Sequence, residues 1–299
     1  MWVRFLPRAY VCDNAAMPTQ TERVNKYYEA TTFDYHTVWT GRNDHAIHFG
    51  YFDTDTPSHS QSLLNMNRVL AARAGITAAD SVLDAGCGYG GSSIWLARTI
   101  GCRVLGLNIV PFQIAKAKRY ARRAGVGDKV DFALQDYAHT TLPEASFDVV
   151  WGLESIVHAP DKAAVVREAY RLLKPGGRLI IAEYTLREQP PLTAAESDSL
   201  TPWLEGWAMP SLLQAGEYLQ LFRSAGFERA AAEDITEHVL PSLRRLEKIL
   251  IALPVGRFLK RIGVFSKEHL GNMEGSRVQI EALKSGYWRY TILTAQKPA

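Results

Sequence analysis

The chain has 299 residues, of which 47% are hydrophobic and 22% are charged, a composition typical of a folded globular protein. Its net charge of +3 gives no indication of nucleic-acid binding, and no apolar run approaches the ~20 residues that a membrane-spanning helix needs. The cysteines Cys12, Cys87 and Cys102 are scattered, so neither a disulfide framework nor a metal site is expected. This cysteine usage predicts a protein of the reducing cytoplasm.

The first 74 residues divide into a tail and an aromatic segment. Residues 1–20 are expected to form a flexible tail, in which Met17 is an alternative start, because Arg4, Pro7 and Arg8 interrupt any signal-peptide core. Residues 21–74 are predicted to form a helical cover, with helices over 22–35 and 58–74. Eight aromatic side chains in this segment either pack against the rest of the chain or line a pocket. They are Tyr27, Tyr28, Phe33, Tyr35, Trp39, Phe49, Tyr51 and Phe52.

Strands and helices alternate through residues 75–299, which we expect to form one α/β domain. Helices are predicted over 111–124, 162–173 and 217–225. Such alternation is typical of a doubly wound, mostly parallel sheet, here of seven strands. A Pro- and Trp-rich lid insertion over 185–216 and a helical insertion over 236–285 interrupt it. Apolar runs predict a first strand that ends at residue 83, and further strands over 103–107, 130–134, 147–152, 178–184, 227–234 and 287–294.

The stretch 81–98, SVLDAGCGYGGSSIWLAR, joins the first of these strands to a helix. It holds four glycines within six residues, Gly86, Gly88, Gly90 and Gly91. Glycines at such a junction let the backbone turn tightly and let a ligand approach the N–H groups at the helix start. Their spacing satisfies the dinucleotide pattern G-x-G-x-x-G, but the preceding Asp84 would repel a pyrophosphate and suits a cationic group. A dinucleotide site and a purely structural glycine turn remain the alternatives.

This arrangement resembles motif I of the class I S-adenosylmethionine (SAM) methyltransferases, in which an acidic residue and glycines hold the amino-acid end of SAM. The resemblance implies a Rossmann-like methyltransferase fold, SAM as the cofactor and a methyltransferase activity. In an open α/β sheet, ligands bind at the carboxyl ends of the strands, so further contacts are expected there. The expected cofactor-binding residues are Asp84, Gly86, Cys87, Gly88, Asn108, Gln113, Gln135, Asp136, Tyr137 and Leu153.

Two of these positions need separate comment. Asn108 follows the second strand, where a nucleotide site prefers Asp or Glu because a carboxylate accepts from both ribose hydroxyls. Asn108 offers one acceptor, and Gln113, about one helical turn on, is expected to supply another contact. Asp136 follows the third strand, where the family's acidic residue reads the adenine amino group. The alternative for Asp136 is a solvated loop carboxylate.

Two longer segments narrow the resemblance. Residues 106–120, GLNIVPFQIAKAKRY, closely resemble the sterol C-24 methyltransferases, in which the Asn after the strand and the Gln-Ile pair are typical. Residues 153–162, LESIVHAPDK, resemble another segment of the same family. This resemblance extends over roughly residues 22–185. The tail segment GYWRY over 286–290 looks more like tocopherol methyltransferases and bacterial methyltransferases of prenyl chains.

The second of these segments supplies the candidate catalytic residues. Glu154 and His158 are four residues apart beyond the fourth strand, so they face one cavity if this loop is helical. With Tyr28 from the aromatic segment, they are the catalytic residues that the resemblance implies. The alternative for Glu154 is a local cap or ion pair, and for His158 a packed loop histidine.

These residue types suit methylation of an isoprenoid double bond, on a prenyl, terpenoid or sterol side chain. An alkene has no proton to lose before it attacks the methyl group, so methylation leaves a carbocation that then loses a proton or cyclises. Aromatic faces stabilise a cation by roughly 0.5–2 kcal/mol each, and a carboxylate does so more strongly in a dry pocket. The alternatives are C-, O- or N-methylation of an aromatic or other small lipophilic metabolite, and a SAM-binding module without catalysis.

The last third of the chain carries a basic amphipathic region. Residues 241–270 contain only Glu247 and Glu268 as acids against seven basic residues, Arg244, Arg245, Lys248, Arg257, Lys260, Arg261 and Lys267. Such a region lies on an anionic membrane, holds a diphosphate, or presents a solvated face to water. Mg²⁺ is expected only if the substrate is a diphosphate. Peripheral membrane contact and a homo-oligomer are left open.

Overall fold

The computed structural model describes residues 18–34, 39, 45–252, 254, 261, 263 and 266–299. Most of the predicted tail lies outside these residues. So do Tyr35 of the aromatic segment and Arg257 and Lys260 of the basic region.

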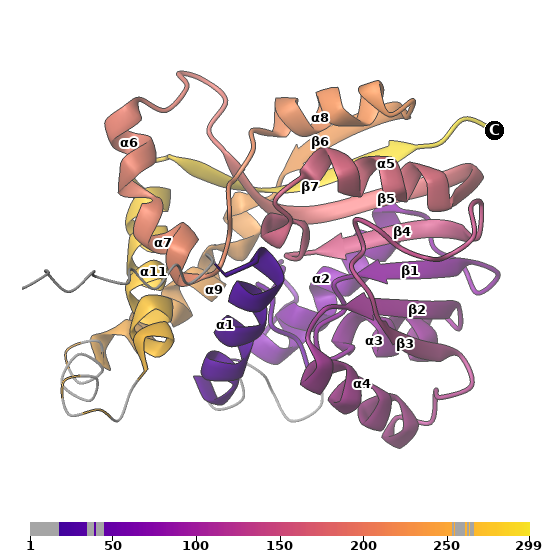
Figure 1. The fold of residues 1–299 in the computed structure, drawn as a ribbon, viewed down its shortest axis with the longest axis horizontal. Coiled ribbons are helices and arrows are strands. Elements are labelled where there is room, and N and C mark those ends of the chain that lie inside the picture. The colour runs from indigo at the N-terminus through magenta and orange to yellow at the C-terminus, as the bar shows by residue number, and fades with distance from the viewer. Residues whose placement is uncertain are drawn as a thin grey trace, which may run out of the picture.

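Seven strands form one sheet in the order β3-β2-β1-β4-β5-β7-β6, with α-helices on both faces (Figure 1). β1 to β5 run parallel, whereas β7 is antiparallel to both β5 and β6. The doubly wound, mostly parallel Rossmann-like sheet is therefore confirmed. The strands are β1 (Ser81–Ala85), β2 (Arg103–Asn108), β3 (Val130–Leu134), β4 (Phe147–Leu153), β5 (Leu173–Leu186), β6 (Glu228–Asp234) and β7 (Trp288–Gln296).

One boundary differs from the sequence-based prediction. The strand predicted over 178–184 begins earlier, at Leu173, so that the Lys174-Pro175-Gly176-Gly177 run directly after the helix belongs to β5. Leu173 pairs with Phe147, and the register shifts before Val149 pairs with Arg178. The glycine run is thus an irregularity within a strand, and periodicity alone does not distinguish it from a helix stop.

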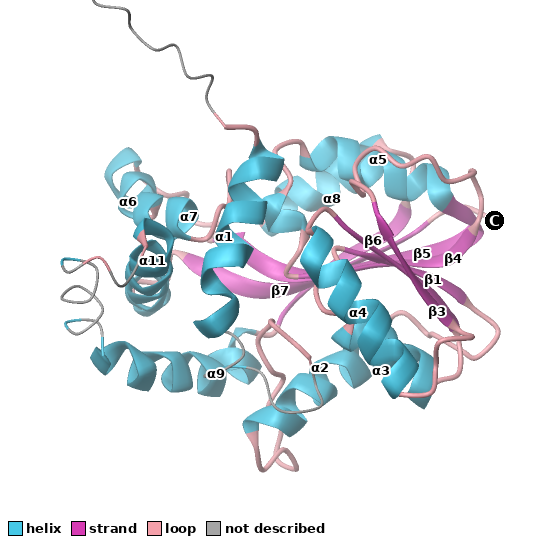
Figure 2. Cartoon of the chain, turned by 60° about the horizontal axis from the view of Figure 1, so that its bottom comes forward, coloured by secondary structure: helices cyan, strands magenta, loops and turns pink. Residues whose placement is uncertain are grey.

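Consecutive residues of the central strands point to opposite faces, and both faces are buried. Val82 and Val149 pack on one side, against α2 (His59–Arg73), α3 (Gly91–Thr99) and α4 (Pro111–Arg123). Leu83 and Val150 pack on the other side, against α5 (Lys162–Leu172) and α8 (Ala215–Ser224). Figure 2 shows these two helix layers on either side of the sheet. Burial on both faces explains the continuous apolar runs that predicted the strands.

The remaining helices gather beyond the carboxyl ends of the parallel strands (Figures 1 and 2). They are α1 (Gln20–Asp34), α6 (Ala194–Ser199), α7 (Thr201–Gly206), α9 (Thr236–Ile249) and α11 (Lys267–Lys284). α7 packs so closely on α11 that a Cβ at Gly206 would lie only 2.2 Å from the carbonyl oxygen of Gly271. Glycine is therefore needed at this contact. α1 contacts α11 through a hydrogen bond of 3.1 Å from the Tyr27 hydroxyl to Asn272 Oδ1. α6 and α7 belong to the predicted lid insertion, and α9 and α11 to the predicted helical insertion. Both insertions therefore lie at the edge of the sheet where ligands bind in such folds.

Within the described part of the chain, every helix is too short or too polar to cross a lipid bilayer.

Candidate active site

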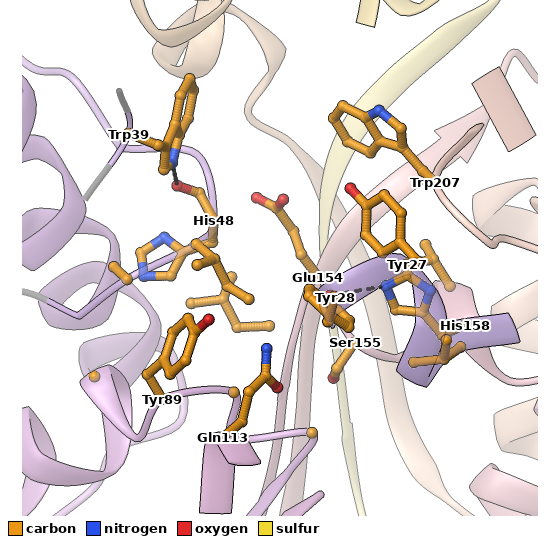
Figure 3. Close-up of a pocket in the computed structure, with 18 of the residues that line it drawn as sticks. Tyr27, Tyr28, Trp39, His48, Tyr89, Gln113, Glu154, Ser155, His158 and Trp207 are labelled. Atoms are coloured by element: carbon orange, nitrogen blue, oxygen red, sulfur yellow. Dashed lines mark hydrogen bonds between the residues drawn. The ribbon is translucent and has the colours of Figure 1, made fainter. Parts of the chain in front are cut away.

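A cavity of about 340 Å³ lies at this edge of the sheet (Figure 3). The glycine loop after β1, the residues after β2 and β4, the segment 45–49, and helices α1, α9 and α11 all contribute to its wall. Among the described residues that line it there is no lysine or arginine. Its aromatic lining consists of Tyr27, Tyr28, Trp39, Phe49, Tyr89, Tyr137, Tyr184 and Trp207.

The glycines of the loop after β1 have different tasks. Gly86 has φ 92°, and a Cβ there would lie 2.3 Å from the Cβ of Ser155, so glycine is needed for packing. Gly88 has φ 53° and lines the cavity, where the nearest atom to an added Cβ is Ile47 Cδ1 at 3.4 Å. The backbone at Gly88 is therefore open to a ligand rather than to the protein core.

Asp84 lies at the end of β1, almost fully buried beside the start of α3. Its carboxylate accepts a hydrogen bond of 2.6 Å from Ser93 Oγ. Burial raises the pKa of Asp84 to about 6, and the bond from Ser93 lowers it in part. A buried carboxylate that also lines the cavity suits a cationic group such as the ammonium of an amino acid.

Asn108 is held in a local network. Its Oδ1 accepts from the backbone N–H groups of Ile109 at 2.8 Å and Val110 at 3.3 Å. Its Nδ2 donates to Gln113 Oε1 at 2.7 Å. That oxygen already stabilises the turn into α4, so the contact of Asn108 with a ribose stays a prediction, for a side chain that lines the cavity. Gln113 is a candidate for contact with the cofactor. Its buried Nε2 has no hydrogen-bond partner among the described residues, and its side chain lines the cavity.

Asn108→Ala is consequently expected to destabilise the fold more than it weakens cofactor binding. The substitution leaves the N–H groups of Ile109 and Val110 without their acceptor, which costs about 1–3 kcal/mol for a buried donor. Urea unfolding monitored by circular dichroism measures this free energy. Gln113→Ala serves as the matched variant, because it leaves only one buried donor, Asn108 Nδ2, without its acceptor. It should therefore lose less stability than Asn108→Ala and bind SAM more weakly. The opposite ranking of the two variants would contradict this assignment.

The other predicted cofactor residues divide into two groups. Cys87, Tyr137 and Leu153 line the cavity, and the Tyr137 hydroxyl donates to the Ser155 carbonyl at 2.7 Å. Gln135 and Asp136 follow β3 but are not part of the cavity wall. Asp136 is exposed, and its carboxylate accepts from the Ala138 N–H at 2.8 Å. That Asp136 binds the adenine amino group stays a prediction, and the adenine would then lie at the rim of the cavity.

Glu154 follows β4 with φ 49°, a conformation that aims its carboxylate between the two walls of the cavity (Figure 3). Its Oε1 accepts from the Phe49 N–H at 2.6 Å and from the Tyr290 hydroxyl at 2.7 Å, and its Oε2 accepts from the Tyr184 hydroxyl. Burial raises the pKa of Glu154 to about 7, although these three hydrogen bonds lower it. Glu154 is therefore a fixed carboxyl group that changes charge near neutral pH.

His158 ends a 3₁₀ turn (Ile156–His158) four residues after Glu154, and both side chains line the same cavity. Its Nδ1 lies 3.2 Å from the Ala208 carbonyl, so Nδ1 carries the proton in this assignment and Nε2 is the acceptor. The Tyr28 hydroxyl then donates to Nε2 at 3.1 Å (Figure 3). Burial lowers the pKa of His158 to about 4, which keeps the imidazole neutral. The structure thus brings the three predicted catalytic residues together.

Sequence reasoning missed the partners of Glu154. Tyr184 and Tyr290 belong to β5 and β7, which are adjacent and antiparallel, and these two tyrosines face each other in the register. They are 106 positions apart in the chain, so no local pattern connects them. A signal existed only in the GYWRY segment, which contains Tyr290 and was read as part of the tail.

These residues fit SAM. A buried carboxylate at Asp84, a buried amide at Gln113 and open space at Gly88 all line the cavity that Glu154 also lines. SAM has an amino-acid end, a nucleoside and a sulfonium, and these residues supply a charged or polar partner for each of them. The sites of Asp84 and Glu154 are electrostatically suited to the two cationic groups of SAM.

Comparison with known proteins supports the same conclusion. Residues 83–181 match the family described as "Methyltransferase domain". A sterol 24-C-methyltransferase of Eremothecium gossypii is 36% identical over 71% of this chain, and the chain spans only 56% of the length of that relative. A 27-O-demethylrifamycin SV methyltransferase of Amycolatopsis mediterranei is 31% identical over 94% of this chain and 98% of its own length.

Among solved structures, the [4+2]-cyclase SpnF has the same fold, with a TM-score of 0.76 and 25% identity over 94% of this chain and 98% of its own. The full-length similarity to the rifamycin enzyme, the matched methyltransferase domain and the SAM-compatible cavity agree. The chain belongs to the SAM-dependent methyltransferases.

Proposed function

We propose that the protein transfers a methyl group from SAM to a carbon of an isoprenoid double bond, on a neutral prenyl, terpenoid or sterol side chain. The observation that carries this proposal is the environment of Glu154. Its carboxylate, held by two tyrosine hydroxyls and one N–H group, faces an aromatic cavity. Such surroundings suit a reaction in which positive charge moves onto a hydrocarbon. Similarity to a sterol 24-C-methyltransferase supports the same chemistry.

The neutral substrate is inferred from the charges around the cavity. A diphosphate needs cationic partners, but the described lining residues include no lysine or arginine. The basic residues of α9 do not fill this role, because Leu246 and Leu250 line the cavity while Arg244 and Lys248 are exposed. Mg²⁺ is expected only if the substrate is a diphosphate, and Arg257 and Lys260 of the basic region lie outside the described residues.

The reaction that we propose balances without a further reactant. SAM supplies an electrophilic methyl group when bound, and the π electrons of the alkene form the new C–C bond as the S–C bond breaks. The positive charge then resides on the neighbouring substrate carbon, where the Glu154 carboxylate and aromatic faces such as Tyr184 and Trp207 stabilise it. Glu154 takes the proton that this cation loses, which leaves a neutral methylated alkene.

Tyr28 and His158 are proposed to select which proton leaves. The neutral imidazole of His158 is fixed by Ala208 on one side and by the Tyr28 hydroxyl on the other. The pair presents a polar contact in the cavity, and His158 ends the 3₁₀ turn that begins two residues after Glu154. Tyr28→Phe and His158→Ala are expected to alter the ratio of alkene products more than the total rate.

A second candidate function is O-methylation of a hydroxyl on a lipophilic metabolite. The specific observation in its favour is the unprotonated Nε2 of His158, which a substrate hydroxyl could approach in place of the Tyr28 hydroxyl. The relative that matches this chain almost from end to end, the rifamycin enzyme, has an O-demethylated compound in its name. In this case His158 is the base and Glu154 binds the sulfonium.

Incubation with trideuteromethyl-SAM and matched substrate pairs distinguishes these functions. The pairs are a sterol with and without its side-chain double bond, farnesol and farnesyl diphosphate, and a tocopherol-type phenol with its methyl ether. The proposal expects label on carbon, only with the alkene-bearing sterol or with farnesol. Label on oxygen selects the second function, and preference for the diphosphate refutes the neutral substrate.

The pH dependence gives an independent check of Glu154. Because burial raises the pKa of this acid to about 7, the group is neutral below that pH and anionic above it. Turnover at saturating SAM is therefore expected to rise through pH ~7 and then level off. His158, with a pKa near 4, adds no second inflection in this range. A turnover rate that does not change with pH across pH ~7 would exclude Glu154 as the ionised group that turnover needs.

Glu183 is the group to control in that experiment, because burial also raises its pKa to about 7. It lies fully buried behind the site, where it accepts from the Val157 N–H at 3.0 Å and from the Tyr218 hydroxyl. The inflection should persist in Glu183→Gln and vanish in Glu154→Gln.

A further inference from the structure

Helix α9 has two faces of opposite character. Leu246, and Leu250 directly after the end of the helix, line the active-site cavity. On the outer face, Arg244 and Lys248 are exposed and one turn apart, and Ile251 of the 3₁₀ turn after the helix (Leu250–Ala252) follows three residues later. Ile251 is 80% exposed, well above the other two large apolar side chains found exposed among the described residues, Leu64 and Leu134.

The charges on this outer face are of one sign. A shallow hollow on the surface is lined, among the described residues, by Pro241, Arg244, Arg245 and Lys248, none of which is acidic. The nearby Glu247 forms an ion pair of 2.6 Å with Lys284 of α11, so its charge is already balanced. A hollow formed by three cations suits the phosphate groups of anionic lipids.

We propose that the outer face of α9, defined here by Arg244, Arg245 and Lys248 together with Ile251 of the 3₁₀ turn after the helix, docks on an anionic lipid membrane. The cations contact the headgroups, and Ile251 inserts at the boundary with the acyl chains. The exposed isoleucine favours a membrane over nucleic acid, because an apolar side chain gains nothing from contact with a phosphate backbone. The inner face of the same helix lines a cavity with many aromatic side chains, which suits a lipophilic substrate. The membrane would then be the source of that substrate.

The same helix is connected to the reaction centre. Ser242 Oγ of α9 accepts a hydrogen bond of 3.0 Å from the Gly50 N–H. The preceding residue, Phe49, donates its N–H to Glu154. Docking of α9 would thus hold the cavity wall and the segment around Phe49 at the membrane surface, next to the carboxylate that faces the substrate. The inference concerns the surface of the protein and does not depend on which atom is methylated.

Co-sedimentation of the full chain with vesicles tests the docking surface. Phosphatidylcholine vesicles with one third phosphatidylglycerol should bind the protein, and pure phosphatidylcholine should not. Binding should weaken at about 1 M salt, where the Debye length falls to ~3 Å. The double variant Arg244→Glu/Lys248→Glu is expected to bind at least about tenfold more weakly, because each basic residue near such a surface contributes roughly a factor of five.

A matched variant controls for net charge. Arg122→Glu/Arg123→Glu makes the same change on the exposed end of α4 and should retain vesicle binding. Ile251→Ser leaves the charge unchanged and should weaken binding severalfold. Equal loss in both charge variants, or full binding by the α9 variant, overturns the proposal. So does tighter binding to duplex DNA than to the anionic vesicles, since the surface is then a general anion site.

Turnover provides the second readout once a substrate is known. The α9 charge variant should be slow with substrate embedded in anionic vesicles but equal to the parent with substrate delivered by cyclodextrin. Its SAM affinity and melting temperature should equal those of the parent, because the changed side chains are exposed. If the variant is equally slow with both forms of the substrate, these residues affect catalysis itself, and the docking proposal is wrong.

Discussion

Glu154→Gln is expected to lower turnover by about 10²–10⁴ at saturating SAM, the range typical for loss of a general base. The amide keeps the size of the side chain and can still accept from the Phe49 N–H, so the cavity wall should stay in place. It loses the negative charge that faces the cationic reaction centre. Rapid-quench turnover together with calorimetric SAM binding measures the two effects separately.

Tyr290→Phe is the matched variant at the same site. It removes one of the hydrogen bonds that lower the pKa of Glu154 but keeps the carboxylate. Its maximal rate should stay within about tenfold of the parent, while the inflection of the pH profile moves upward. If Glu154→Gln turns over at the parental rate with unchanged products, Glu154 is only a structural acceptor for the Phe49 N–H and the two tyrosines.

The fold was largely predictable because the physical signals are local. Continuous apolar runs mark strands that are buried on both faces, as the alternation of Val82 with Leu83 between the two helix layers shows. The glycines after β1 mark a turn that only residues with φ near 53–92° can form. Both signals lie within a few residues of the feature that they predict.

The candidate site was predictable only where one segment carries several of its residues. Glu154 and His158 are four residues apart around one short 3₁₀ turn (Ile156–His158), and both line the cavity, as expected for a helical loop. The hydrogen bonds to Glu154 come from Phe49, Tyr184 and Tyr290, which the sheet and the aromatic segment bring together from three distant places. Such partners depend on the strand order, in which β7 enters between β5 and β6, and no local pattern contains that order.

Asn108 illustrates a different limit. Its position after β2 suggested contact with a ribose, and the residue does lie at the cavity. The competing use of its oxygen, as acceptor for the first N–H groups of the turn into α4, depends on a side-chain rotamer that sequence position does not define. Gln113, whose buried donor has no partner among the described residues, is the better candidate for a cofactor contact.

Gly88→Val is expected to lower SAM affinity by at least about 100-fold, or about 2.7 kcal/mol, while the fold remains intact. At Gly88 an added Cβ meets nothing closer than Ile47 Cδ1 at 3.4 Å, so the valine fits the protein but occupies the cavity where the ligand approaches. Gly86 and Gly90 would not serve for this test, because a Cβ at either position lies within 2.6 Å of another side chain.

Gly125→Val supplies the control for backbone strain. Gly125 has φ 71°, comparable to the φ of Gly88, and an added Cβ there meets nothing within 4 Å. Both variants should therefore lose similar stability, about 1–2 kcal/mol for an L-residue in the left-handed region. Only Gly88→Val should lose SAM binding in titration calorimetry. Parental affinity in Gly88→Val would remove the glycine loop from the cofactor site, whereas equal losses of affinity in both variants would assign the effect to strain.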